Sequence, residues 1–382
     1  MTDPGSGGSL AGVPLRIALV TELYEPSVGG QQTRFRSLAH GLRDLGHDVT
    51  IIATMHESGL TADEVLDGIR VLRGPLLPNY MSPLLTQTVR SPLGMARYAW
   101  RCRRVLRANR FDAIYFNQWP YLHILLSGRH ARQRAGIDWC EARDGAIHRL
   151  PERILPKIVR FDLAVNQWTA DVLTRRSGIQ VGYLPSGVDS ARFTKSETER
   201  SGLLFLGRLV ENKNLPLLIS GFAEYRARGG QETLVVAGSG PEDRAMRAII
   251  ADLDPSVAAA IRVLGEVSDD TKRELLATKR LLVIPSRREG FPNAVVEALA
   301  SGMPTVTVSS PENGTAHVVE QYGIGTVGEP TSVSLAVAID KALANWTPLS
   351  LRCLDLSPQF DWSVLSNQLS TALTDAAQGS TR

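Results

Sequence analysis

The sequence is poor in cysteine and in long apolar runs. Of its 382 residues only Cys102, Cys140 and Cys353 are cysteines, and no two have the CxxC spacing of a redox or zinc site. The longest apolar stretches, such as Leu281–Pro285, fall far short of the roughly 20 residues that span a bilayer. Residues 1–14 are rich in Gly, Ser and Pro and lack a basic start, so we interpret them as a loose tail rather than a signal peptide. We therefore expect a cytoplasmic protein, either free or held peripherally at the inner face of a membrane.

The chain also lacks the common nucleotide-binding fingerprints. Neither the GxGxxG motif of nicotinamide and flavin enzymes nor a P-loop motif follows an expected strand. The net charge of +3 is too small for a dedicated nucleic-acid binder, but it conceals an asymmetry. Residues 1–195 carry 25 Lys and Arg against 17 Asp and Glu, whereas the remainder carries 17 against 22. A basic half and an acidic half indicate two domains that handle different ligands.

Short β-branched runs alternate with amphipathic stretches along the whole chain, which is typical of an α/β fold with parallel sheets. The clearest predicted strands are Arg16–Val20, Asp48–Ala53, Asp112–Phe116, Leu203–Leu206, Leu234–Ala237, Leu281–Ile284 and Thr305–Val308. The clearest predicted helices are Gln31–Leu45, Leu215–Arg228, Asn293–Ser301, Ser332–Trp346 and Trp362–Ala376. We predict a first domain in residues 1–184, a linker in 185–200, a second domain in 201–357 and a final helical segment in 358–382.

The most informative segment runs from Pro285 to Pro304. A predicted strand ends at Pro285, a loop with Gly and Pro follows, and a helix begins near Asn293. The amides of Gly290–Val295 are then donors at a helix N-terminus, which favours a phosphate there. Glu289 precedes this helix and Glu297 lies one turn inside it, so the two carboxylates can accept hydrogen bonds from one hydroxyl-bearing ligand at different depths.

Two further loops follow predicted strands. Arg208 and Lys213 come after the strand Leu203–Leu206, and a guanidinium with an ammonium suits a diphosphate. In the first half, Gly29 and Gly30 stand between the first strand and the first helix, where adjacent glycines let the backbone approach a ligand.

Together these segments resemble the retaining glycosyltransferases of family four (group 1 type). Glu289 and Glu297 span an E-x7-E signature, and Gly207 to Asn214 looks like the diphosphate clamp of the family. Gly238–Pro241 and Leu264–Val267 also match, as does Pro185–Asp189, with Ser186 where Asn is usual. The resemblance implies the GT-B architecture, in which two Rossmann-like domains have a donor cleft between them and the final helix crosses back to the N-terminal domain.

The resemblance also implies a nucleotide diphosphate sugar as the donor and a role for each matching residue. Arg208 and Lys213 would neutralise the diphosphate, with amides near Ala294 and Val295 and the Gly29-Gly30 loop completing its cradle. Glu297 would hold the ribose hydroxyls, and the backbone near Val267 would border the base. The donor sugar would be held by Glu289, the amides of Gly290 and Phe291, and Asn293.

By the same resemblance, transfer to an acceptor hydroxyl retains the anomeric configuration and requires neither a divalent metal nor a cofactor. Asp252-Leu253-Asp254 is a nominal DxD, but its position at a helix end before Pro255 favours a solvated pair of carboxylates. Two alternatives remain open. One is a sugar-nucleotide epimerase of the same fold, and the other is a nonenzymatic subunit that binds sugar nucleotides.

One position departs from the family pattern. Many members carry a His after the strand that corresponds to Asp112–Phe116, and here Asn117 stands in its place. Asn117 can hydrogen-bond a donor sugar but cannot take a proton near neutral pH. His123 lies nearby, on a predicted helix where a structural role is the more common one.

The predicted helix Leu93–Arg110 carries six arginines, Arg110 included, together with Tyr98 and Trp100. Basic residues with aromatics can lie on anionic lipid, but these arginines are distributed almost around the helix, which favours a solvated surface over a membrane-facing one. The excess of basic residues in the first half favours an acceptor that is anionic or presented at a membrane. We expect a small-molecule, saccharide or lipid-linked acceptor and no nucleic-acid partner, with peripheral membrane contact as an open alternative.

Overall fold

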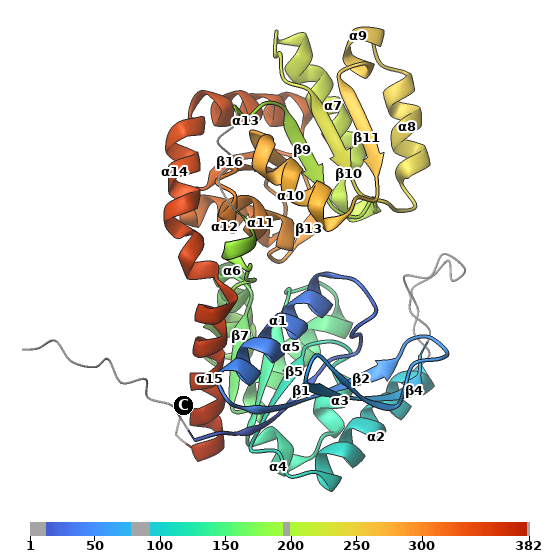
Figure 1. The fold of residues 1–382 in the computed structure, drawn as a ribbon, viewed down its shortest axis with the longest axis vertical. Coiled ribbons are helices and arrows are strands. Elements are labelled where there is room, and N and C mark those ends of the chain that lie inside the picture. The colour runs from blue at the N-terminus through green and yellow to red at the C-terminus, as the bar shows by residue number, and fades with distance from the viewer. Residues whose placement is uncertain (1–12, 78–91, 194–198, 380–382) are drawn as a thin grey trace, which may run out of the picture. The chain divides into compact units, whose positions relative to one another are not determined.

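The computed structural model describes residues 13–77, 92–193 and 199–379. They form two compact units (Figure 1). The first unit comprises Met1–Asp138, Arg153–Leu163 and Ser366–Arg382, and the second comprises Trp139–Glu152 and Ala164–Leu365. This grouping differs from the expected boundaries, because residues 139–152 and 164–184 group with the second unit. Residues 366–382 group with the first, and there Ser370 Oγ lies 2.7 Å from His47 Nε2.

The first sheet has the strand order β3-β4-β2-β1-β5-β6-β7-β8, and its last strands reach into the residues of the second unit. Its strands are β1 (Arg16–Val20), β2 (Asp48–Met55), β3 (Asp63–Leu66), β4 (Ile69–Leu76), β5 (Ala113–Asn117), β6 (Ala135–Trp139), β7 (Phe161–Ala164) and β8 (Gly182–Tyr183). The helices between them are α1 (Gly30–Asp44), α2 (Pro92–Ala108), α3 (Leu122–Leu126), α4 (Arg129–Arg132), α5 (Ala146–Ile158) and α6 (Gln167–Ser177). β1 pairs in parallel with both β2 and β5, so it lies at the centre of this sheet.

The sequence explains why β1 and α1 form. Ile17–Val20 are wholly buried, as a central parallel strand covered on both faces requires. Phe35, Leu38 and Leu42 of α1 repeat at helical spacing and are also buried. Gly46, just after α1, takes the positive φ of 90° that favours glycine beyond a helix C-terminus.

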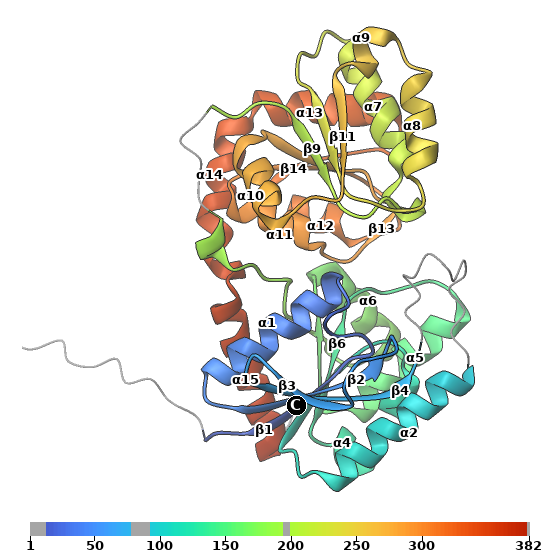
Figure 2. The same ribbon diagram turned by 45° about the vertical axis from the view of Figure 1, so that its right-hand side comes forward.

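The second sheet has the order β11-β10-β9-β12-β14-β16 and is parallel throughout. Its strands are β9 (Leu203–Leu206), β10 (Leu234–Ala237), β11 (Ile261–Gly265), β12 (Leu281–Ile284), β14 (Thr305–Val308) and β16 (Gly325–Gly328), and β13 (Arg288–Glu289) pairs separately with β15 (Glu312–Asn313). The helices are α7 (Leu215–Ala227), α8 (Asp243–Ala251), α9 (Pro255–Ala258), α10 (Asp269–Thr278), α11 (Asn293–Ala300), α12 (Gly314–Tyr322), α13 (Ser332–Ala344) and α14 (Trp346–Leu356). The last helix, α15 (Trp362–Gln378), groups with the first unit from Ser366 onwards. Figure 2 shows helices on both faces of this sheet.

Successive residues of β9 serve two different cores. Leu203 and Phe205 belong to a cluster that includes Leu218 of α7 and Leu335 of α13. The alternate residues, Leu204 and Leu206 among them, belong to a cluster with α11 and α12 on the opposite face of the sheet. Because both faces are buried, the strand is apolar at every position, as expected for a parallel sheet between two helical layers.

The predicted α/β class is confirmed, and the bounds of β1, β9, β10, β12 and β14 agree with the predicted strands. The β3–β4 hairpin, α12, α14 and β16 were not predicted. The final helix does form, as α15. None of the helices in the described part of the chain combines the length and the apolar character needed to span a bilayer.

The carboxyl ends of β9 and β10 approach one another closely at two glycines. A Cβ added to Gly238, which has a φ of 146°, would lie 1.8 Å from the carbonyl oxygen of Gly207. Gly229, in the loop after α7, has a comparable positive φ of 92° but no heavy atom within 4 Å of such a Cβ. A side chain at either position would therefore strain the backbone, but only at Gly238 would its Cβ also collide with a neighbouring atom.

We predict that Gly238→Ala destabilises the fold more than Gly229→Ala. Gly229→Ala should lower the free energy of unfolding by about 1–2 kcal/mol, which is the cost of a left-handed conformation for a residue with a Cβ. Gly238→Ala should add about 1–3 kcal/mol, because the Gly207 backbone must also move. Urea unfolding of both variants measures the difference. An equal loss of unfolding free energy in the two variants would show that the close approach of Gly238 to Gly207 adds nothing to the cost of the substitution.

Candidate functional site

The strand order of the second sheet marks where a ligand site is expected. β9 has β10 on one side and β12 on the other, so the chain order reverses between β9 and β12. In open parallel sheets ligands bind outside the carboxyl ends of the strands at such a reversal. The segments that leave these two ends carry Arg208 and Lys213 after β9, and Glu289 after β12.

The structure brings Lys213 and Glu289 into direct contact. Lys213 Nζ donates to Glu289 Oε1, and both side chains are largely shielded from solvent, with exposed fractions of 11% and 15%. Ser286 Oγ lies 3.5 Å from the same carboxylate oxygen. Arg208, which is exposed, leaves the same strand end five residues before Lys213. The residues predicted to bind the diphosphate and the residue predicted to bind the donor sugar therefore lie next to each other.

Asn212, for which no role was predicted, explains how this contact forms. Its side-chain amide donates to the carbonyl oxygen of Arg288 at 3.1 Å, and its own carbonyl oxygen accepts from the amide of Arg287 at 2.8 Å. These two hydrogen bonds tie the turn Glu211–Lys213 to β13. Asn214 then reverses the chain in a left-handed conformation, with a φ of 56°, before α7 begins.

Glu297, the second carboxylate of the predicted signature, is held by a residue that sequence reasoning missed. Lys272 of α10 donates to Glu297 Oε1 at 2.9 Å and lies 3.4 Å from Asp269. Burial alone would lower the pKa of Lys272, but the two carboxylates, chiefly that of Glu297, raise it above its usual value. The lysine thus stays charged and keeps the Glu297 carboxylate in place on α11.

The N-terminus of α11 presents open backbone donors. Pro292 precedes the helix and supplies no side-chain cap. The amide of Val295 donates to the Pro292 carbonyl at 3.0 Å, whereas no described residue accepts from the amides of Asn293 and Ala294. Phe291 and Val295 are buried, so their side chains belong to the core and only their backbones can face a ligand. Val267 is half-buried against the same core.

Two polar side chains fix the loop between Glu289 and α11. Asn166 Nδ2 donates to the carbonyl oxygen of Gly290 at 3.0 Å, while its Oδ1 caps α6 by accepting from the Thr169 amide at 2.7 Å. Ser186 Oγ donates to the Phe291 carbonyl at 2.9 Å, so the residue that replaces the usual Asn still anchors this loop. A single Asn or Ser in a loop carries no local sequence signal of this role.

The first unit holds the other predicted residues at its own strand reversal, between β1 and β5. Gly29 precedes α1 and Gly30 is its first residue. Asn117 ends β5, is buried, and accepts from the Trp119 amide at 3.0 Å through its Oδ1. Beneath α1, Arg34 forms a buried pair with Asp138 at 2.7 Å, and Tyr115 donates to the same carboxylate. This network fixes α1 against β5 and β6.

Two residues considered from the sequence have structural roles. His123 of α3 is wholly buried beside the rings of Tyr98 and Phe116, and this burial lowers its pKa to about 3. The ring is therefore neutral at physiological pH. In the nominal DxD, Asp254 caps α9 by accepting from the Ser256 amide at 2.8 Å.

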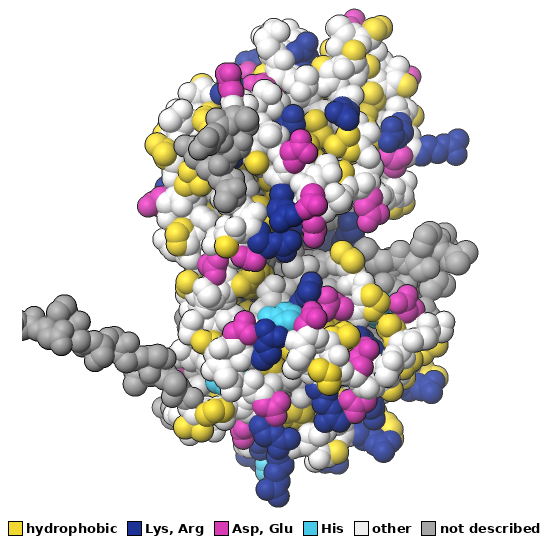
Figure 3. Space-filling view, in the orientation of Figure 1, with side chains coloured by type: hydrophobic (Ala, Val, Ile, Leu, Met, Phe, Trp, Pro, Cys, Tyr) yellow, Lys and Arg dark blue, Asp and Glu magenta, His cyan; other side chains and the backbone are white. Residues whose placement is uncertain are grey.

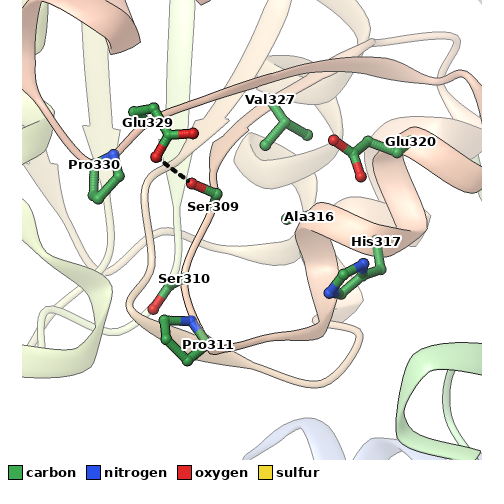
Figure 4. A pocket seen from close by; sticks show the side chains of 9 residues that line it. All are labelled: Ser309, Ser310, Pro311, Ala316, His317, Glu320, Val327, Glu329 and Pro330. Carbon is green, nitrogen blue, oxygen red and sulfur yellow. Dashed lines mark hydrogen bonds between the residues drawn. The ribbon is translucent and has the colours of Figure 1, made fainter. Parts of the chain in front are cut away.

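Two surface pockets of the second unit flank these elements. One, of about 590 Å³, is lined by residues next to the Lys213–Glu289 contact, including Asn212, Arg288 and Glu312. The other, of about 330 Å³, lies between α12 and the ends of β14 and β16, where Ser309 donates to Glu329 at 2.9 Å (Figure 4). None of the sequence-predicted site residues lines either pocket, so neither is the predicted donor site itself.

Comparison with known proteins gives consistent results. A family model described as "Glycosyl transferase 4-like domain" matches residues 29–176, and one described as "Glycosyl transferases group 1" matches residues 189–354. The chain is 26% identical to a phosphatidyl-myo-inositol mannosyltransferase of Mycolicibacterium smegmatis, over 93% of this chain and 92% of that protein.

Solved structures are similar over nearly the full length. Sucrose-phosphate synthase from Thermosynechococcus elongatus superposes with a TM-score of 0.72 at 17% identity, over 94% of this chain and 98% of that one. An Anabaena protein solved in complex with UDP and glucose superposes with a TM-score of 0.69 at 16% identity, over 94% and 100%. These likenesses confirm the predicted GT-B fold. With both family models matched in order along it, the chain belongs to the group 1 (family four) glycosyltransferases.

Proposed function

We propose that this glycosyltransferase moves a sugar from a nucleotide diphosphate donor to an acceptor hydroxyl with retention of configuration and without a metal ion. The observation that carries the proposal is the contact between Lys213 and Glu289 at the strand reversal of the second sheet. A cation for phosphate and a carboxylate for sugar hydroxyls then lie at the two sides of the bond that breaks.

The diphosphate would be held by charge and by backbone. Arg208 is exposed and offers a planar fork, and Lys213 offers a compact ammonium. The open amides of Asn293 and Ala294 add the positive end of α11. These groups would stabilise the negative charge that develops on the leaving phosphate, which is where electrostatic catalysis acts most strongly.

The nucleoside and the sugar would be held by the two carboxylates. Glu297, kept in place by Lys272, would accept hydrogen bonds from both ribose hydroxyls. Glu289 would accept from hydroxyls of the donor sugar, next to the amides of Gly290 and Phe291. Since Asn166 and Ser186 fix the carbonyl groups of this loop, its amides have a fixed orientation before the ligand arrives.

The chemistry then needs few protein groups. The bond from the anomeric carbon to the phosphate oxygen breaks, and the acceptor oxygen bonds to the same face of the carbon. The acceptor proton passes to the departing phosphate oxygen, so no side chain has to act as the base. This assignment suits Asn117, which cannot take up a proton. The named relatives differ in acceptor, and we therefore assign none to this chain.

We predict that Lys213→Met and Glu289→Gln each lower kcat by about a hundredfold or more, since each removes a group that stabilises the transition state. Each should also lower the free energy of unfolding by about 3 kcal/mol, because the partner charge stays largely buried and unpaired. Steady-state kinetics and urea unfolding measure the two effects. Lys341→Met and Glu274→Gln, at exposed positions of α13 and α10, are the matched controls.

The double variant Lys213→Met with Glu289→Gln separates a structural role from a functional one. It leaves no unpaired charge, so it should recover most of the lost stability. Its turnover should stay as low as that of the single variants. Recovery of turnover together with stability would contradict the assignment of these residues to the donor.

If the reaction is metal-independent and retaining, two further measurements have defined outcomes. With excess EDTA the rate should stay within about twofold of the untreated rate, because the cations of the protein rather than a metal neutralise the leaving group. The NMR spectrum of the product should show the anomeric configuration of the donor. Loss of activity in EDTA that Mn²⁺ restores, or an inverted product, would contradict the proposed mechanism.

A further inference from the structure

The helix α2 presents one solvent-exposed face that is both apolar and cationic. Its buried residues, Tyr98, Ala99, Cys102 and Val105 among them, face the first unit. Five of its exposed side chains follow one another at spacings of four, three, four and three residues, which places them on a single stripe of a helix. They are Leu93, Arg97, Trp100, Arg104 and Arg107.

Two apolar side chains belong to this stripe. Leu93 and Trp100 are 69% and 57% exposed, an uncommon position for side chains of this size. Arg104 lies over the Trp100 ring at 4.8 Å from its centroid, which holds the indole at the surface. Arg97, Arg104 and Arg107 lie within the exposed stripe, and Arg101 and Arg103 are half-buried at its margins. The arginines that looked evenly distributed in the sequence therefore lie on the exposed side of the helix.

The neighbouring helix α3 extends the same surface. Arg103 donates to the carbonyl oxygen of Leu126 at 3.0 Å, and Arg132 of α4 donates to that of Leu125 at 2.6 Å. Leu125 and Leu126 are 40% and 39% exposed. In Figure 3 dark-blue and yellow side chains lie together over the lower edge of this unit, where Figure 1 places α2 and α4. We call the exposed stripe of α2 with these two leucines the α2 surface.

The charge of the α2 surface selects its partner. Residues 92–111 contain no Asp or Glu, and within the described residues Arg97, Arg104 and Arg107 form no ion pair. A solvated helix would need no exposed Trp, and a nucleic acid would make little use of Leu93, Leu125 and Leu126. A bilayer interface takes both kinds of group, because apolar side chains enter the acyl boundary while arginines stay among anionic headgroups.

We propose that the α2 surface docks this glycosyltransferase peripherally on the surface of an anionic lipid bilayer. Binding of this kind is independent of the donor site, since all its residues belong to the first unit and none has a role in the proposed transfer. It would present the enzyme to acceptors at a membrane surface.

Vesicle co-sedimentation of the full chain tests the proposal. The wild type should bind vesicles of equal parts phosphatidylcholine and phosphatidylglycerol, and bind phosphatidylcholine vesicles much more weakly. Arg97→Gln with Arg107→Gln should lower the partition coefficient by about 25-fold, at roughly fivefold for each arginine near an anionic surface. Trp100→Ala should lower it severalfold with the charge unchanged. The matched control is Arg244→Gln with Arg262→Gln, which removes two exposed arginines from the second unit.

The outcomes separate clearly. A loss of vesicle binding that is confined to the α2 variants supports the proposal. The proposal is overturned if the wild type does not sediment with anionic vesicles, or if the partition coefficient of the control variant falls as far as that of the α2 double variant. It is also overturned if Trp100→Ala binds vesicles as well as the wild type does, because binding would then depend on charge alone, as at a polyanion site. Nucleoside diphosphate binding should be the same in the wild type and the α2 variants. Failure of the membrane proposal is therefore distinguishable from failure of the donor site.

Discussion

The candidate site depends on one interaction, the ion pair between Lys213 and Glu289. Two opposite charges in a largely shielded position are stable only when each has its partner, so the loops after β9 and β12 are held in register by electrostatics. The pair also positions both groups before any ligand binds. A phosphate can then take over the ammonium and a sugar hydroxyl the carboxylate, with little rearrangement of the protein.

Backbone geometry makes this pair possible. Glycine at position 238 lets the ends of β9 and β10 approach, and the hydrogen bonds of Asn212 place the Lys213 turn on β13. On the other side, Asn166 and Ser186 hold the carbonyl groups of the Glu289 loop. These contacts involve no charge and no catalytic chemistry. They nonetheless determine whether a cation, a carboxylate and a helix N-terminus point at one ligand.

The sequence was sufficient for the parts of the fold that bury apolar runs. β9, β10 and β12 were predicted with their observed bounds because each is continuously apolar between polar or Gly-containing loops. The β3–β4 hairpin was missed because β3 alternates exposed and half-buried residues and includes Asp63 and Glu64. In the site, E-x7-E and the Arg208 loop were readable as motifs. The contacts of Lys272, Asn166 and Asn212 were not, since each joins the residue to one far away in the chain.

The central claim is that the strand reversal of the second unit binds the diphosphate of a sugar nucleotide. The most direct measurement is the shift in melting temperature caused by UDP, GDP and ADP, each against its monophosphate, in the wild type and in Lys213→Met. A ligand that binds only the folded state raises this temperature. The account predicts that one diphosphate stabilises the wild type well beyond its monophosphate and that Lys213→Met removes the difference. Equal shifts by mono- and diphosphates, or an undiminished shift in Lys213→Met, would contradict it.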